Sequence, residues 1–292
     1  MSFHEGTMPV KYLIGFSSLF LAACASSSPV LQPTSLPTAP APVAESPAQP
    51  SWTFVRDGIP RAYVSTTNAT FEQQSNPTRA ANSTSATTEF TLAFQGDDLS
   101  RFQVTVERLS YSGGARPDRN TSGLVFPLVF TGSHLDGKPV FDSASLSALT
   151  GCTNPAHTTF FTVTRNLIVM PMELTQGATW SDSTVLSGCS GSIPVQLTVT
   201  RAYTISGQAE HNGRAVLVID QIGRVTSAGE GAEGQHRVFL QSRGTESGRL
   251  YLEPVSGFLL EAETEQTSTV TVTTSGRSQI FVQKVHERVE RR

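Results

Sequence analysis

The sequence has little charge, few cysteines and few tryptophans. Lys, Arg, Asp and Glu make up 15% of its 292 residues, the formal net charge is -3, and there are 3 Cys and 2 Trp. Such a balance favours neither nucleic acid nor another polyanion as a partner. The composition therefore excludes no enzyme class, but it argues against a nucleic-acid-binding protein.

Short catalytic and nucleotide-binding motifs are also missing. Residues 229–234 match G-x-G-x-x-G, but a strand is expected after them and Glu230 and Glu233 would repel phosphate, so we interpret this stretch as an exposed loop or a sheet edge. Residues 188–192 resemble a nucleophile elbow but lack its final glycine. We expect no cofactor and no local catalytic motif. A hydrolase with a site assembled from distant residues is the third and last of our hypotheses.

The sequence also gives little evidence for a metal site. The histidines are scattered and form no H-E-x-x-H or similar pattern. Glu261, Glu263 and Glu265 alternate along one strand, where their carboxylates could bind a hard cation such as calcium. Because Arg288 and His286 are expected to lie opposite them, we interpret these three residues as a solvated, charge-paired face.

The N-terminal region has the features of an export signal. Lys11 precedes an apolar run over residues 12–23, which ends in the small residues Ala22 and Ala23. The run is shorter than the roughly 20 apolar residues that a membrane-spanning helix needs. Met8 is a second possible start, because Glu5 is unusual before an export signal. We predict a signal peptide over residues 1–23.

The motif Leu21-Ala22-Ala23-Cys24 resembles the lipobox of bacterial lipoproteins. The resemblance implies cleavage before Cys24 and attachment of a diacylglycerol to its sulfur. It also implies sorting to the outer membrane, facing the periplasm, because residue 25 is Ala and not Asp. Several acyl chains, at about 0.8 kcal/mol per buried methylene, would make this anchor permanent. The alternative is a plain secretory signal that is cut near Cys24.

The segment after Cys24 is typical of a disordered tether. Residues 25–50 are mostly Ala, Ser, Pro and Thr, with a single charge at Glu45. Such a segment buries too little apolar surface to offset its ordering entropy. Fully extended at about 3.1 Å per residue, it would span on the order of 80 Å. The remainder, residues 51–292, is long enough for one all-β domain.

The cysteine count supports export. If Cys24 carries lipid, Cys152 and Cys189 remain as a single possible pair. We predict a disulfide between them, with two buried free thiols as the alternative. A metal site is not expected, because no His or Cys lies at ligand spacing near either residue.

Alternating apolar residues predict strands in most of residues 51–292. Residues 90–94 and 102–106 alternate cleanly on either side of a turn at 96–98, which predicts a hairpin. Asp136-Gly137 and Asn212-Gly213 are typical two-residue hairpin turns. A C-terminal meander is predicted with strands at about 213–226, 235–253, 257–274 and 278–289.

The register of the last hairpin follows from its turn. If Ser275 and Gly276 form the turn, Glu263 lies opposite Arg288 and Glu265 lies opposite His286. The other face of the same two strands then carries apolar residues, namely Leu260, Ala262, Val270, Val272, Phe281, Val285 and Val289. One register therefore gives a charge-paired face and an apolar face, as a sheet with one buried face requires.

The segment between the two cysteines is the one predicted helix. Asn154 can cap it, Pro155 fits its first turn, and residues 160, 161, 164, 167 and 168 fall on one helical face. The threonines and Val163 in this segment favour a strand instead, which remains the alternative. We predict a short helix near 155–169, packed on a single large curved antiparallel sheet that forms a half-barrel or an open barrel.

The domain loosely resembles the LolA and LppX type of envelope lipoproteins. This resemblance depends on the lipobox, the C-terminal meander and the apolar segment 160–170. It implies a hydrophobic cavity between sheet and helix, and the residues that we expect to line it are Phe160, Phe161, Leu167, Ile168 and Trp180. We therefore expect a non-enzymatic, lipid-anchored envelope lipoprotein that binds a lipid or another hydrophobic ligand. The alternative is a structural or assembly protein that docks other envelope proteins through its sheet.

Overall fold

The computed structural model describes one part of the chain. The chain divides into two units, Met1–Pro47 and Ala48–Arg292, and all described residues lie in the second. These residues are 50–74, 82–96, 99–113, 125–135, 138–142, 152, 160, 163, 171, 173–190, 193–233 and 235–292. The predicted signal peptide, Cys24 and most of the predicted tether lie outside them.

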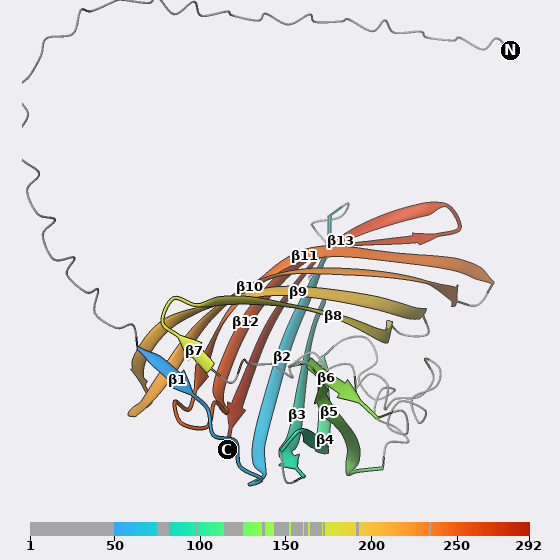
Figure 1. Ribbon diagram of the computed structural model, residues 1–292. Helices are drawn as coiled ribbons and strands as arrows, with labels where there is room; N and C mark the ends of the chain where they lie inside the picture. The colour runs from blue at the N-terminus through green and yellow to red at the C-terminus, as the bar shows by residue number, and fades with distance from the viewer. Residues whose placement is uncertain are drawn as a thin grey trace, which may run out of the picture. The chain divides into compact units, whose positions relative to one another are not determined.

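The described residues are almost entirely β-strands (Figure 1). The strands are β1 (Ser51–Thr53), β2 (Arg61–Gln73), β3 (Asn82–Gln95), β4 (Arg101–Gly113), β5 (Leu128–Leu135), β6 (Lys138–Phe141), β7 (Glu173–Thr175), β8 (Thr179–Ser190), β9 (Ile193–His211), β10 (Arg214–Glu233), β11 (His236–Leu252), β12 (Leu259–Thr274) and β13 (Arg277–Arg291). None of the helical residues that the structure describes forms a segment long and apolar enough to cross a membrane.

Eleven strands form one curved antiparallel sheet that does not close. Their order is β6-β5-β4-β3-β2-β13-β12-β11-β10-β9-β8, so β6 and β8 are its two edges (Figure 1). The pairing of β2 with β13 joins the N-terminal strands to the C-terminal meander. Strands β1 and β7 form a separate two-stranded sheet. The predicted fold class, a large unclosed antiparallel sheet with very little helix, is confirmed.

Two of the predicted hairpin turns are present, whereas Asp136-Gly137 lies outside the described residues. Asn212 and Ser275 have φ of 52° and 50°, and the glycine after each has φ of 74° and 78°, as a two-residue turn with positive φ at both positions requires. Glu263 pairs with Arg288 and Glu265 with His286, so the predicted register is confirmed. The hairpin of residues 90–94 with 102–106 is also confirmed, with Phe94 opposite Phe102.

One interpretation of the meander is wrong. Residues 229–233, which we expected in an exposed loop or at a sheet edge, belong to β10 and pair with β11 on one side. Gly229 also pairs with Val195 of β9 on the other side, and a Cβ at Gly229 would lie 2.4 Å from the carbonyl oxygen of Pro194. Glycine is therefore present here because two strands approach closely. The match to G-x-G-x-x-G gave no indication of this packing role.

The helix predicted near 155–169 lies mostly outside the described residues. Of its members, Phe160 and Val163 are described, and both have helical backbone and buried side chains. Both belong to the main hydrophobic cluster, which collects large side chains from β1 to β5, β7 and β9 to β13. The face of the sheet that carries Tyr203, Leu250 and Ala262 of this cluster is called the inner face below, and the opposite face is called the outer face.

Candidate ligand site on the inner face of the sheet

Phe160 is held in an aromatic cluster at one side of the inner face. Its ring lies 5.1 Å from that of Phe130 on β5 and 4.7 Å from that of Phe141 on β6, both in edge-on geometry. Phe141 in turn meets Phe102 of β4 at 5.3 Å. Such edge-on pairs stabilise a core beyond their area burial alone. Phe160 therefore contributes to the packing of β4, β5 and β6, and its predicted role in lining a cavity stays a prediction.

Among the other predicted cavity residues, Trp180 is described. Phe161, Leu167 and Ile168 lie outside the described residues. Trp180 lies on the edge strand β8, half-buried against the main cluster, with its ring stacked on that of Tyr203 at 4.9 Å and 17°. Its indole nitrogen Nε1 is buried and has no hydrogen-bond partner among the described residues. Trp180 thus combines an apolar ring at the edge of the sheet with a buried donor that has no partner among the described residues.

Tyr203 links Trp180 to a polar group. The Tyr203 hydroxyl donates to Oδ2 of Asp182, two residues along β8 from Trp180, at 3.0 Å. Burial raises the pKa of Tyr203 above its usual value, so the hydroxyl keeps its proton and remains a donor. The indole of Trp180 and the carboxyl group of Asp182, both on the edge strand β8, therefore lie on either side of the neutral phenol of Tyr203 on β9.

An ion pair is buried beside this group on the inner face. Arg201 of β9 donates from Nε to Oε1 of Glu246 on β11 at 2.5 Å, and their side chains are 8% and 1% exposed. Gln221 of β10, the strand between them, donates to the same oxygen at 2.8 Å. Burial alone would lower the pKa of Arg201, but the negative charge of Glu246 raises it above its usual value, so the guanidinium stays charged.

A glycine on β10 leaves space for this ion pair. Gly223 lies between Arg201 and Glu246 in the strand register. A Cβ at Gly223 would lie 2.7 Å from Cγ of Glu246 and 3.0 Å from the carbonyl oxygen of Thr200. Glycine at 223 therefore allows the Glu246 side chain to cross β10 toward Arg201.

The ion pair is part of a wider band of buried polar residues. We call this band the polar belt, and its members are Arg201, Gln221, Glu246, Gln266, Ser268, Glu287 and Ser65. Gln266 donates to Ser268 at 2.8 Å, and Ser65 donates to Glu287 at 3.0 Å. Along β9 and β10 the belt separates the main hydrophobic cluster from a second one formed by Leu197, Val199 and Val225. The inner face is thus apolar at two levels and polar between them.

The polar belt was not predicted from the sequence. Along β9, residues 195, 197, 199, 203 and 205 are apolar and alternate onto one face, and the same alternation includes Arg201. The sequence signal for the belt was Arg201, a charged residue at a position that the strand alternation assigns to the buried face. Its partner could not be identified from spacing, because Glu246 lies 45 residues away and two strands across the sheet.

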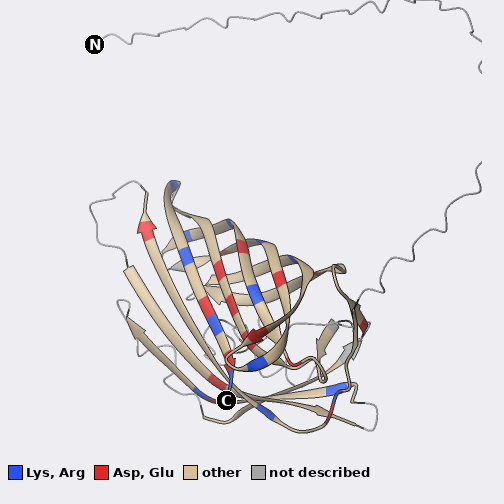
Figure 2. Ribbon diagram, turned by 90° about the vertical axis from the view of Figure 1, so that its left-hand side faces the viewer, with Lys and Arg blue, Asp and Glu red and all other residues tan. Residues whose placement is uncertain are grey.

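The outer face carries charges of both signs on neighbouring strands (Figure 2). Arg249 pairs with Asp220 and His286 with Glu263, both at 2.8 Å. Glu263 and Glu265 are exposed, as we predicted for a solvated face. Glu261 lies on the same face and pairs with Arg288, but it is buried, so the interpretation as a solvated residue is wrong for it.

His211 and Arg288 hold the Glu261 carboxylate. Nε2 of His211 lies 2.8 Å from one oxygen of Glu261, and Nε of Arg288 donates to the other at 3.0 Å. Burial alone would raise the pKa of Glu261, but these two bonds and the Arg288 charge lower it below its usual value. The carboxylate is therefore satisfied within the protein. Across the described part of the chain, no cluster of three or more His, Cys, Asp or Glu side chains is arranged to hold a metal ion.

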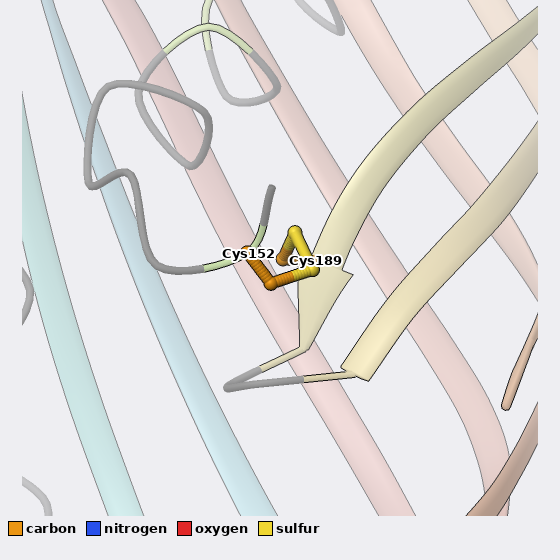
Figure 3. Close-up of a disulfide and its surroundings, with 2 residues drawn as sticks. All are labelled: Cys152 and Cys189. Atoms are coloured by element: carbon orange, nitrogen blue, oxygen red, sulfur yellow. A yellow bond between two sulfur atoms is a disulfide. The ribbon is translucent and has the colours of Figure 1, made fainter. Parts of the chain in front are cut away.

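The predicted disulfide is present. The sulfurs of Cys152 and Cys189 are 2.10 Å apart, and their Cα atoms are 5.4 Å apart. Figure 3 shows the bond at the end of β8, close to the start of β9. A cavity of about 500 Å³ lies beside it, lined by residues that include both cysteines, Pro194 and Glu230. The bond fixes the chain at Cys152 to the edge strand that carries Trp180.

Tyr63 gives the inner face a pH-dependent group. Its phenol is buried and stacked on Phe90 at 5.3 Å, and its hydroxyl has no hydrogen-bond partner among the described residues. Burial raises the pKa of Tyr63 to about 12.

We expect this shift to lower stability at alkaline pH. The unfolded chain, with a tyrosine pKa of about 10, loses the proton first, so the free energy of unfolding falls between pH 10 and about 12. At pH 11 the loss from Tyr63 is about 1 kcal/mol. Urea unfolding at pH 9 and pH 11 checks this. Between these two pH values the free energy of unfolding should fall less for Tyr63→Phe than for the unsubstituted protein. An equal fall in both would contradict it.

Comparisons with known proteins give little. No protein-family model matches the chain, and no curated protein matches it in sequence. Among solved structures, the chain is similar to a loop L8 deletion mutant of OmpT, an outer membrane protein of Vibrio cholerae. That similarity has 8% sequence identity and a TM-score of 0.22, and it covers 80% of this chain and 100% of the other. A similarity this low carries no argument about fold or function.

Proposed function

We propose that this protein is a lipid-anchored lipoprotein of the cell envelope, whose β-domain binds a hydrophobic ligand on the inner face of its open sheet. The anchor is a diacylglycerol on Cys24, at the outer membrane and facing the periplasm, as the lipobox resemblance implies. The proposal assigns no catalytic residue and no cofactor.

The observation that carries this proposal is the environment of Trp180. Its half-buried ring extends the main apolar cluster to the edge of the sheet, and its Nε1 donor has no partner among the described residues. Ligand sites are mostly apolar, with a few polar groups that fix the orientation of the ligand. A ligand with an acyl chain and a carboxyl or ester oxygen suits this combination, because the oxygen accepts from Trp180.

Extraction of the purified domain tests the proposal. The protein is exported from residue 48 onward, without Cys24, so that its own anchor contributes no lipid. Organic extraction followed by mass spectrometry should yield about one lipid molecule per protein chain. An empty protein would overturn ligand binding. Labelled palmitate should enter the complete chain at Cys24 and should be absent from a Cys24→Ser variant.

Trp180→Phe is expected to lower the lipid content severalfold. The substitution keeps an aromatic ring over Tyr203 and removes the Nε1 donor, so the ligand loses the group that orients it. The melting temperature of the empty protein should change little. The matched control is Phe239→Ala, which removes an exposed ring from β11 and should leave the lipid content unchanged. Equal lipid content in wild type and Trp180→Phe would remove Trp180 from the site.

The edge strand β8 supports a second candidate function, the docking of another envelope protein. Among the described residues β8 pairs with β9 alone, and over its 12 residues it contains one charged residue, Asp182, and no proline. Natural edge strands usually carry charges or prolines that prevent pairing with another chain. An empty domain that binds an envelope protein, and loses this binding with Val185→Pro, would favour docking over ligand transport.

A further inference from the structure

Two neighbouring loops expose a group of apolar side chains. We call this group the rim patch, and its members are Val55, Ile59, Pro60 and Val255. Val55, Ile59 and Val255 are 68%, 61% and 70% exposed. The backbone N–H of Val55 donates to the carbonyl oxygen of Val255 at 2.9 Å, so the two loops lie side by side. Single exposed apolar residues are common, whereas here three strongly exposed ones fall on two loops that a backbone hydrogen bond joins.

The loops of the rim patch are fixed in place from below. Phe54 and Phe258, next to the patch in sequence, are buried in the main cluster. Asp57 accepts from the backbone N–H of Ile59 at 3.0 Å and pairs with Arg61 at 2.8 Å. The patch is therefore preformed, and its apolar side chains point away from the core without a rearrangement.

The opposite ends of the strands differ in character. There the β12–β13 turn consists of Ser275 and Gly276, and the described residues at the start of β11 include the exposed His236 and Arg237. At the rim patch, by contrast, two adjacent loops present valine, isoleucine and proline. Near the β12–β13 turn, Phe239 and Ile280 are 39% and 40% exposed, so the valine and isoleucine side chains of the rim patch, at 61% to 70%, are the more exposed ones.

The rim patch lies close to the point where the N-terminal segment enters the domain. Pro50, whose carbonyl oxygen accepts from Gln176 at 2.9 Å, is five residues before Val55. In Figure 1, β1 leads toward the loops at the lower end of the strands, where the C-terminus also lies. Between Cys24 and Pro50 the chain reaches at most about 80 Å, so a membrane that holds the anchor is within reach of the patch.

Arg56 adds a positive charge beside the patch. Its guanidinium lies over the ring of Phe94, 4.7 Å from the centroid, and it is half-buried. Within the described part of the chain, Arg56 forms no ion pair with a carboxylate. A basic side chain with an apolar stem next to exposed apolar residues is typical of surfaces that bind the phosphate and acyl boundary of a bilayer.

We propose that the rim patch docks on the phospholipid bilayer that holds the protein's own lipid anchor, with Val55, Ile59 and Val255 in the headgroup region and Arg56 on a lipid phosphate. This inference depends on the proposed lipid anchor at Cys24. Docking brings the end of the sheet that carries the rim patch, with Phe54 and Phe258 buried beneath it, next to the membrane.

Vesicle sedimentation tests the docking. The exported chain with Cys24→Ser is mixed with vesicles of phosphatidylethanolamine and phosphatidylglycerol, and its vesicle-bound fraction is measured. Val55→Asp combined with Val255→Asp should weaken the partition at least tenfold, and Arg56→Ala should weaken it severalfold. Ile222→Asp, on the outer face at a position that is 66% exposed, should leave it unchanged. Melting temperatures confirm that each variant is folded.

The outcomes separate the docking from the anchor. No vesicle binding by the Cys24→Ser chain, or equal loss in the rim-patch and Ile222→Asp variants, overturns the docking. Palmitate labelling of the unsubstituted chain reports the anchor independently. Labelled Cys24 without vesicle binding overturns the rim patch alone, and vesicle binding without labelled Cys24 supports the rim patch while it overturns the anchor.

Discussion

Replacing Glu246 by alanine is expected to lower the free energy of unfolding by about 3–5 kcal/mol, the usual result of removing one partner from a buried ion pair. The variant leaves the Arg201 guanidinium buried without its nearest carboxylate and removes the acceptor of Gln221. The charge of Arg201 cannot be relieved by deprotonation, because its pKa is far above any tolerated pH. Urea unfolding followed by circular dichroism measures the loss.

The double variant Arg201→Met with Glu246→Leu separates charge from packing. Both charges are then replaced by apolar side chains of similar size, and such replacements are often neutral or stabilising. We expect the double variant to recover most of the stability that Glu246→Ala loses. Equal losses in the two variants would contradict this account, because the cost would then come from packing and not from an uncompensated charge.

An exposed pair supplies the control. Nε2 of His286 lies 2.8 Å from Oε1 of Glu263 on the outer face, where the two side chains are 40% and 55% exposed. Solvent screens this pair, so Glu263→Ala should change the free energy of unfolding by less than about 1 kcal/mol. The contrast between Glu246 and Glu263 then measures the effect of burial on two carboxylates of the same type.

Local features of the fold were predictable from the sequence. The register of the last hairpin followed from the turn at Ser275 and Gly276 together with alternation along β12 and β13. Both signals lie within about 30 residues of chain, and a one-residue shift would have exposed the whole apolar set. The disulfide followed from counting, since one pair remained after Cys24 was assigned to lipid.

Features that join distant segments were not predictable. The pairing of β2 with β13 brings Ser65 next to Val289, more than 200 residues apart, and nothing local to either strand specifies the other. The polar belt is of the same kind. A hydrophobic pattern identifies Arg201 as an exception to its face, but its partners become known only when the order of β9, β10 and β11 is known.

The candidate ligand site was predicted in part. Trp180 was one of the predicted cavity residues, and the structure stacks its ring on Tyr203 and buries its Nε1 donor without a partner among the described residues. Asp182 and Tyr203, which complete its polar surroundings, were not proposed as site residues. They join Trp180 through the β8–β9 register, where Trp180 lies opposite Tyr203. The dipeptide Gly191-Ser192 between the two strands is a two-residue hairpin signal from which this register could have been derived, but it was not used.

Loss of the disulfide should be the second large effect on stability. Cys152 and Cys189 are 37 residues apart, and cross-linking a loop of this length stabilises a protein by roughly 4 kcal/mol in the chain-entropy model. We expect Cys152→Ser combined with Cys189→Ser, in a Cys24→Ser background, to lose about 2–5 kcal/mol of unfolding free energy. Reduction of the unsubstituted pair should give the same value, and a reducing agent should not affect the double variant. An unchanged unfolding midpoint would contradict the prediction.

Removing the disulfide can destabilise the whole domain or only the end of β8, and the residues that lose protection distinguish the two. Cys189 lies near the end of β8, and Trp180 lies near its start, so fraying at the disulfide leaves the stacked pair of Trp180 and Tyr203 intact. Hydrogen exchange should then accelerate at residues 187–190, while tryptophan fluorescence and lipid content stay constant. If reduction also releases the lipid, the disulfide holds a part of the ligand site, and the segment around Cys152 must cover the inner face next to β8.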